Sequence, residues 1–124
     1  MTHKFPINWF EIPASNFDRA VEFYRTILNR ELSISHVNGA DMAFFSNEPL
    51  AVSGVIIHGE GAEPSAKGIL LYLNGGDDLD VPLSKVEDAG GTIILPKTMI
   101  SEELGYYALF LDSEGNRLAL HSMK

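Results

Sequence analysis

Residues 7–24, INWFEIPASNFDRAVEFY, run from an extended segment through a short break into an amphipathic helix. Ser15 is a good N-cap for that helix, and Asp18 three residues later resembles part of a capping box. The apolar residues that follow at helical spacing predict one buried face, made of Phe17, Ala20, Val21, Tyr24, Ile27 and Leu28. Glu11 does not fit this plan, because it places a carboxylate in an apolar strand two residues after Trp9, the only tryptophan of the chain.

The first half of the chain continues with short extended segments. Three are expected, at residues 32–37, 42–46 and 52–58. The pair Asn38-Gly39 between the first two is a hairpin turn signal, because both residues tolerate a positive φ. The small and polar segment GEGAEPSAK, residues 59–67, then predicts a linker or long loop.

The second half repeats the order of the first. A strand is expected at residues 68–74 and a helix at 77–89, with Pro82 in its first turn and Gly90-Gly91 after it. Three further strands are expected, the last two joined by the turn DSEGN, at residues 92–95, 106–111 and 117–121.

Together the two halves predict a single α+β domain over residues 1–124. It consists of two modules of one strand, one helix and three strands, at about 5–58 and about 68–122. The segment PKTMISEELG, residues 96–105, is expected to be a loop that either closes over a ligand or is simply solvated.

The composition narrows the range of functions. The net charge is −8 and the basic residues are scattered, so nothing indicates binding to nucleic acid or to an anionic membrane surface. The absence of cysteine excludes disulfides, thiolate metal sites and a cysteine nucleophile. No apolar run is long enough to span a bilayer, and the first residues lack the apolar region of a secretory signal, so we expect a cytoplasmic protein.

Three stretches of the chain resemble the vicinal oxygen chelate superfamily, also called the glyoxalase/bleomycin resistance/dioxygenase superfamily. They are FEIPASNFDRAVEFYRTIL at the start, KVEDAGGTI around the second expected helix, and YYALFLDSEGNRLALHS at the end. The resemblance implies a fold of paired βαβββ modules with curled mixed sheets, and chains that form homodimers. It also implies that family enzymes hold a divalent metal in the cup of a sheet through His, Glu or Gln side chains. Because the fold hosts many chemistries, the resemblance points to the fold more strongly than to an activity.

The family's four metal ligands fall on residues that cannot bind a metal through a side chain. The resemblance places them at Ile7, near Gly54, near Gly68 and at Ala119. We therefore expect no metal cofactor at the usual position. This argues against the isomerase, dioxygenase and thiol-transfer reactions of the family at that site, because they need the metal as a Lewis acid. A relocated divalent metal is the alternative, because suitable donor atoms are present on Glu11, His58 and His121.

Strand alternation predicts which side chains line the cup, with Ile7 and Ala119 as references for the inward face. On that basis Glu11 is the candidate catalytic residue. The candidate ligand-binding residues are Trp9, His58, Tyr72, Arg117 and His121. A carboxylate in such a cup must be hydrated, paired or hydrogen-bonded, because an unpaired buried charge is costly.

Each candidate also has a purely structural explanation. Glu11 can pair with a structural arginine such as Arg117, contact a ligand, or lie at an exposed rim. His121 can end the last strand, and His58 can face solvent beside the linker. Trp9 and Tyr72 each have a polar group at the end of an aromatic ring. Such side chains suit the wall of a pocket, but they can equally belong to the core.

Three functions are compatible with the sequence. The first is binding of a small organic molecule, as implied by family members of the antibiotic-resistance type, which hold a drug between two subunits without metal chemistry. The second is a lyase, isomerase or dioxygenase that uses Glu11 as a general base with a relocated or absent metal. The third is a module recognised by another protein. The missing metal ligands and the aromatic inward positions favour the first, a homodimer with a small-molecule ligand.

Overall fold

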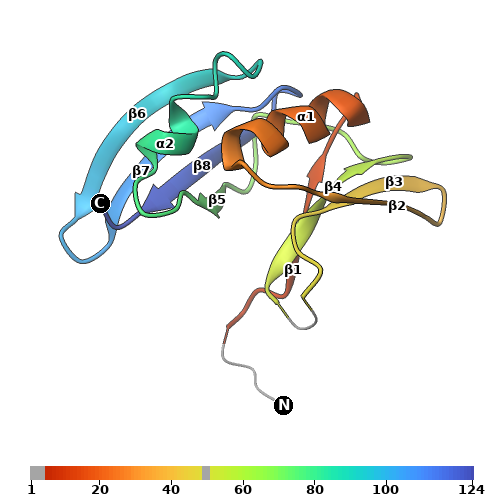
Figure 1. Cartoon of the computed structure of the whole chain (residues 1–124), viewed down its shortest axis with the longest axis horizontal. Coiled ribbons are helices and arrows are strands. Elements are labelled where there is room, and N and C mark those ends of the chain that lie inside the picture. The colour runs from red at the N-terminus through yellow and green to blue at the C-terminus, as the bar shows by residue number, and fades with distance from the viewer. Residues whose placement is uncertain (1–4, 49–50) are drawn as a thin grey trace.

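The first module forms a four-stranded mixed sheet with one helix (Figure 1). A computed structural model describes residues 5–48 and 51–124. The elements of this module are β1 (Trp9–Pro13), α1 (Phe17–Leu28), β2 (Ser33–Val37), β3 (Ala40–Phe44) and β4 (Ser53–His58). We call the sheet, with strand order β1-β4-β3-β2, sheet A; β1 and β4 are parallel and the other neighbours antiparallel. The hairpin between β2 and β3 turns at Asn38 and Gly39, both with positive φ, as the sequence predicts.

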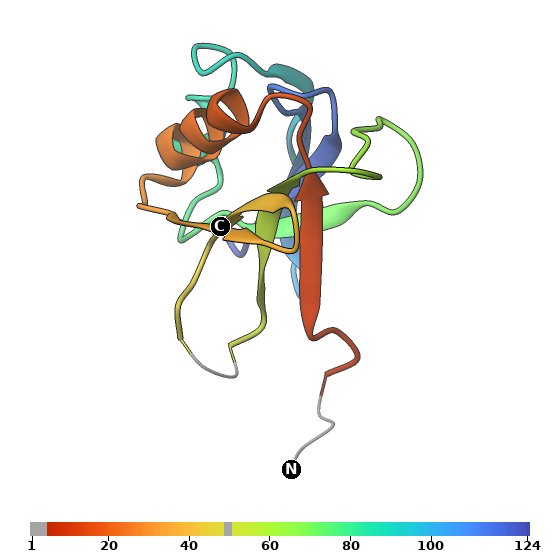
Figure 2. The ribbon, with the colours of Figure 1, turned by 90° about the vertical axis from the view of Figure 1, so that its right-hand side faces the viewer.

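The second module repeats this arrangement. It contains β5 (Leu71–Asn74), α2 (Asp80–Leu83), β6 (Thr92–Ser101), β7 (Gly105–Leu111) and β8 (Arg117–Ser122). Its strands form sheet B in the order β5-β8-β7-β6, with the parallel pair β5 and β8 in the place of β1 and β4. The linker, residues 59–70, holds no helix or strand and passes beside the C-terminal end of β1 (Figure 2). The fold of paired βαβββ modules is confirmed, and the sheets are not closed.

One shared core joins the two sheets, and α1 lies where they meet (Figure 1). The buried face of α1 consists of Ala20, Phe23, Tyr24 and Ile27. Phe23 stacks on Phe110 of β7 with ring centroids 6.1 Å apart, and Tyr24 meets Phe45 just after β3 at 5.8 Å. Because residues of both sheets and of α1 belong to the same core, the inner face of each sheet points toward α1.

Hydrogen bonds at the turn 112–116 connect the second module to the first. The Tyr24 hydroxyl donates to Asp112 Oδ2 at 2.6 Å inside the core. Burial, reinforced by the Asp112 carboxylate, raises the pKa of Tyr24, so this hydroxyl keeps its proton. Asn116 Nδ2 donates to the Pro13 carbonyl oxygen at 2.7 Å, which fixes the end of β1 against the start of β8.

The first turn of α1 differs from the sequence-based prediction. Asn16 is the N-cap, with an extended backbone, and its side-chain oxygen accepts from Arg19 N at 3.1 Å. Ser15 is not the cap; its hydroxyl instead donates to Glu114 of the turn 112–116 at 3.2 Å. Asp18 lies in the first turn, where its charge suits the helix dipole, but it completes no capping box.

The second helix is much shorter than expected. The helix predicted at 77–89 is a single turn, α2, and residues 84–90 form successive turns. Backbone bonds from Lys85 to Pro82 and from Val86 to Leu83 span three residues, so the segment lacks the regular helical ladder.

The loop expected at residues 96–105 is largely strand. β6 extends to Ser101, and its register with β7 shifts between Leu95 and Thr98. Pro96 lies at that shift, where no residue of β6 is paired with β7. The missing N–H of the proline therefore removes no hydrogen bond between the strands, and β6 continues past it. Only residues 102–104 form a turn, and the prediction of a mobile loop is wrong.

Candidate functional site

The open face of sheet A is the side that points away from α1. Alternation along β1 turns Trp9 and Glu11 to this face, as predicted, while the residues between and after them pack on the core. The cross-strand register puts Val55 and Phe44 on the same face. The Trp9 and Phe44 rings lie 6.0 Å apart, and Val55 is fully buried although it faces away from the main core.

The open face of sheet B carries a second aromatic pair. Tyr72 of β5 lies opposite Ala119 of β8, and the Tyr72 and Tyr107 rings are 6.2 Å apart. Alternation along β8 places Arg117 and His121 on this same face, as the sequence predicts.

Backbone carbonyls hold the two polar side chains of this face. His121 Nε2 donates to the Leu104 carbonyl oxygen at 2.6 Å, since a carbonyl oxygen only accepts. Arg117 Nη2 donates to the Gly68 carbonyl oxygen at 3.3 Å, whereas its Nε is buried without a partner among the described groups. The Arg117 guanidinium therefore retains unused donors for a ligand.

The predicted site residues do not all line one cavity within a single chain. Both inner faces belong to the core around α1, so the two open faces point away from each other. Trp9 and Glu11 lie on the open face of sheet A, and Tyr72, Arg117 and His121 lie on that of sheet B. Strand alternation assigns each residue to a face, but the relative orientation of the two sheets comes from long-range packing.

His58 lies on neither open face, so the prediction that it shares a cup with Glu11 is wrong. It projects from the inner side of sheet A, in cross-strand register with His36 and Asp41. His58 Nδ1 donates to the Ala14 carbonyl oxygen at 2.8 Å, and His36 Nδ1 lies 2.5 Å from Asp41 Oδ1. This row lines a pocket of about 480 Å³ at the start of α1. His36 and Asp41 face each other across the hairpin of β2 and β3, and His58 joins them from β4 through the cross-strand register.

Comparisons with known proteins agree with this architecture. The sequence model of the Glyoxalase/Bleomycin resistance protein/Dioxygenase superfamily matches residues 6–120. The chain belongs to this superfamily. No curated protein matches the sequence. None of the described helices is long and apolar enough to cross a membrane.

Solved structures of superfamily members share the fold at low sequence identity. TnmS3, an antibiotic binding protein from Streptomyces sp. CB03234, is 21% identical with a TM-score of 0.71, and the match covers 98% of each chain. A glyoxalase/bleomycin resistance protein from the same organism is 22% identical with a TM-score of 0.69, covering 92% of this chain and 97% of that one. Glyoxalase I from Zea mays is 15% identical with a TM-score of 0.72, covering 94% of this chain but 44% of that one.

The residues to which the resemblance assigns the superfamily's metal ligands do not fit a metal. Ala119 lies on the open face but has no donor atom, and Gly68 lies in the linker before β5. Gly54 is turned toward Phe10, whose backbone oxygen leaves no room for a Cβ. The relocated set of Glu11, His58 and His121 is not assembled either. Among the described residues no group of three or more His, Asp or Glu side chains is arranged to hold a metal ion.

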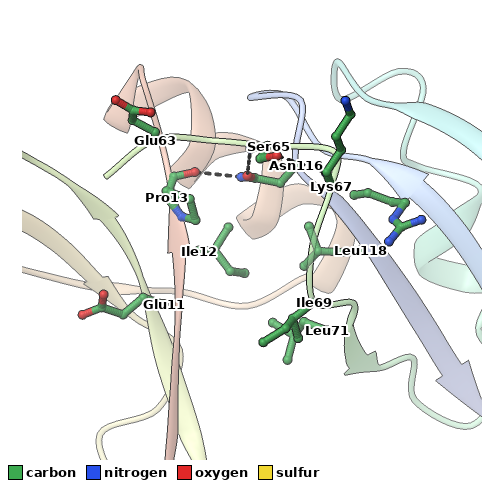
Figure 3. A pocket seen from close by; sticks show the side chains of 11 residues that line it. Glu11, Ile12, Pro13, Glu63, Ser65, Lys67, Ile69, Leu71, Asn116 and Leu118 are labelled. Carbon is green, nitrogen blue, oxygen red and sulfur yellow. Dashed lines mark hydrogen bonds between the residues drawn. The ribbon is translucent and has the colours of Figure 1, made fainter. Parts of the chain in front are cut away.

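A small pocket of about 240 Å³ lies where β1 meets the linker and β8 (Figure 3). Glu11 and Arg117 both line it, but they form no ion pair with each other. In Figure 3 the Glu11 side chain extends away from Leu71 and Leu118. The interpretation of Glu11 as the partner of a structural Arg117 is therefore wrong, and its carboxylate is exposed on the open face.

Proposed function

We propose that this protein binds a small organic molecule on its open sheet faces, without the metal of the family's enzymes. The observation that carries the proposal is the aromatic pair on each open face, Trp9 with Phe44 and Tyr72 with Tyr107. Trp9 is 45% exposed and Tyr72 is 47% exposed, so large ring surfaces remain available for contact. Such rings offer flat apolar area with a polar tip, which suits a planar organic ligand.

A second copy of the chain completes the site in this proposal. The two open faces of one chain point away from each other, so a ligand held between them needs a partner. In a homodimer with a twofold axis, the open face of sheet A lies opposite the partner's sheet B, and two equal grooves form. Exposed apolar patches of this kind are typical of interaction surfaces. Antibiotic binding by TnmS3, a protein of the same fold, supports the choice of ligand class.

Polar side chains set the orientation of the ligand in this proposal. Glu11 accepts from a donor group of the ligand, because its carboxylate has no partner among the described residues. Arg117 donates to the ligand through the guanidinium N–H groups that are not bonded to the Gly68 carbonyl oxygen. His121 lies on the same face.

The first test is a ligand screen with variants of both open faces. Planar aromatic antibiotics and metabolites are screened by their shift of the melting temperature, and hits are titrated by calorimetry. We expect Trp9→Ala and Tyr107→Ala each to weaken binding about tenfold, as the loss of a well-packed aromatic contact does. Val81→Ala, an exposed apolar residue of α2, is the control and should bind as wild type. If both aromatic variants bind every hit as tightly as wild type, the open faces are not the site.

The second test is the oligomeric state. Light scattering after size-exclusion chromatography should give the mass of a dimer, and Tyr107→Arg should shift it toward monomer, because two strongly hydrated charges per dimer enter the interface. A wild-type chain that binds ligand as a monomer would contradict the groove between copies.

A further inference from the structure

A larger pocket lies between the two modules, beside β1, β5 and the end of α1. It has a volume of about 590 Å³ and is lined by Phe10 of β1, Phe45 after β3, Leu28 at the end of α1, and Leu71 and Leu73 of β5. These side chains belong to, or pack against, the shared core. Tyr72, whose ring lies on the open face of sheet B, also lines the pocket, so the pocket adjoins that face. Its size falls within the range of sites for drug-sized ligands.

This pocket differs in charge from the rest of the molecule. The chain has 17 acidic residues and a net charge of −8, yet no acidic residue lines the pocket. Each of four other pockets on the described residues includes at least one carboxylate, among them Glu11, Asp18, Glu31 and Asp77. An anion entering this pocket therefore meets no carboxylate in its wall.

Among the residues that the structure describes, Arg30 is the only charged one that lines the pocket. It follows α1, it is exposed, and it makes no ion pair with any described residue. Arg25, one turn earlier, is by contrast engaged with Glu22 at 2.9 Å and Glu31 at 3.6 Å. The charge of Arg30 is thus uncompensated by the protein.

Two polar residues of the wall add further hydrogen-bond donors. Asn74 Oδ1 already accepts from Gly76 N at 2.9 Å, which leaves the Asn74 amide NH₂ as the free group. Ser53 also lines the pocket and carries a hydroxyl. Apolar walls with a guanidinium, an amide NH₂ and a hydroxyl match a ligand with an apolar body and an anionic head.

We propose that this pocket is a binding site for an organic anion, an aromatic or long-chain carboxylate or sulfonate, with its apolar body against the core side chains and its head at Arg30. The site lies within one chain and requires no partner copy. It goes beyond the proposed function, which concerns the open faces.

Two fluorescent probes of similar shape test the proposal on the full chain. Anilinonaphthalene sulfonate carries the anionic head, and phenylnaphthylamine is its neutral counterpart. We expect Arg30→Gln to weaken sulfonate binding about tenfold, the equivalent of one charge-assisted hydrogen bond, and to leave the neutral probe unchanged. Arg25→Gln is the matched control, because it also removes one positive charge, about one turn earlier in the chain. It should leave the Kd of both probes unchanged.

A second variant locates the probes. Val52 lines the pocket and is 57% exposed, so Val52→Trp fills the entrance without disturbing the core and should weaken both probes. If Arg30→Gln and Arg25→Gln weaken sulfonate binding equally, Arg30 does not hold the anionic head. If Val52→Trp leaves the Kd of both probes unchanged, the probes do not bind in this pocket. Tyr107 does not line the pocket, although its neighbour Tyr72 does. Tyr107→Ala should therefore leave the Kd of both probes unchanged while it weakens a ligand held on the open face of sheet B.

Discussion

Glu114 is a single side chain that joins the two modules. Its carboxylate accepts hydrogen bonds from Arg19 Nε at 2.7 Å, from the Asn16 backbone N–H at 2.7 Å and from the Ser113 hydroxyl at 2.9 Å. Burial alone would raise the pKa of Glu114, but Arg19, Asn16 and Ser113 outweigh it and lower this pKa to about 2. The side chain is only 1% exposed, so its charge depends on these partners.

The lowered pKa of Glu114 predicts a loss of stability in acid. The folded value lies below the ordinary 4.5, so the stabilisation is complete above about pH 4.5 and disappears as the pH falls toward about 2. With about 1.4 kcal/mol per pKa unit, the drop from 4.5 to about 2 contributes at most about 3.5 kcal/mol to the free energy of unfolding. In urea titrations, the difference in that free energy between wild type and Glu114→Gln should therefore shrink as the pH falls.

Glu87→Gln is the control for this experiment, since Glu87 is exposed on the turns after α2. Its difference from wild type should be small and independent of pH. A difference for Glu114→Gln that stays constant between pH 5 and pH 2 would show that the carboxylate is not stabilised in the way described.

Glu11 illustrates what the sequence can say about one residue. Alternation along β1 correctly predicts that Glu11 shares a face with Trp9 and points away from the hydrophobic core, because the side-chain period of a strand is local information. Its lack of a partner was not predictable, because that depends on where Arg117 lies in another sheet. The same limit explains why the row of His36, Asp41 and His58 was missed.

At the scale of elements, α1 determines how the modules combine. Its aromatic residues reach Phe110 in sheet B and Phe45 beside sheet A, and its first turn is fixed by the turn 112–116. The helical period predicted most of its buried face, although Phe23 is buried and Phe17, Val21 and Leu28 are only partly so. Sheet B packs on α1 as well as sheet A, and the local sequence of α1 does not show on which side sheet B lies.

The N-cap of α1 can be checked by a pair of substitutions. Asn16→Ala removes the bond from Arg19 N to the side-chain oxygen and should lower the free energy of unfolding by about 1 kcal/mol. Ser15→Ala removes only the 3.2 Å bond to Glu114, which keeps its other partners, and should cost less. Chemical denaturation of both variants gives the comparison, and a larger loss for Ser15→Ala would reverse the assignment of the cap.

The second module shows where pattern reasoning fails for elements. Acidic residues, a proline and two glycines indicated a long helix at 77–89, but only Asp80–Leu83 is helical. Pro96 suggested the end of a strand, but a register shift lets β6 continue. Both errors concern segments whose form is set by neighbouring strands and not by their own propensity.

The whole molecule has two modules but one core, so it should unfold in one step. Trp9 reports on the first module by fluorescence, and three of the four tyrosines, Tyr72, Tyr106 and Tyr107, report on the second by near-ultraviolet circular dichroism. We expect the two signals to give the same midpoint in urea at a fixed protein concentration, because α1 belongs to both halves. Separate midpoints would mean that each module is stable without the other.

The paired βαβββ architecture was predictable because the order of elements repeats along the chain, and both four-stranded sheets confirm it. The arrangement of the sheets was not. The pattern of inward residues left open whether the two modules of one chain form one cup, and in the structure Trp9 and Tyr72 lie on the open faces of different sheets. Local periodicity assigns a residue to a face of its own sheet and carries no information on how two sheets are turned relative to each other.

The linker contributes neither helix nor strand, while α1 and the turn 112–116 hold the halves together through side chains. The covalent connection between the modules is therefore not what keeps them associated. A polypeptide cut within residues 59–70 yields two fragments that each carry one part of the shared core. That is the property needed for reassembly of separately made pieces, and it makes this chain a natural starting point for a two-part reporter or for a version in which the order of the halves is reversed.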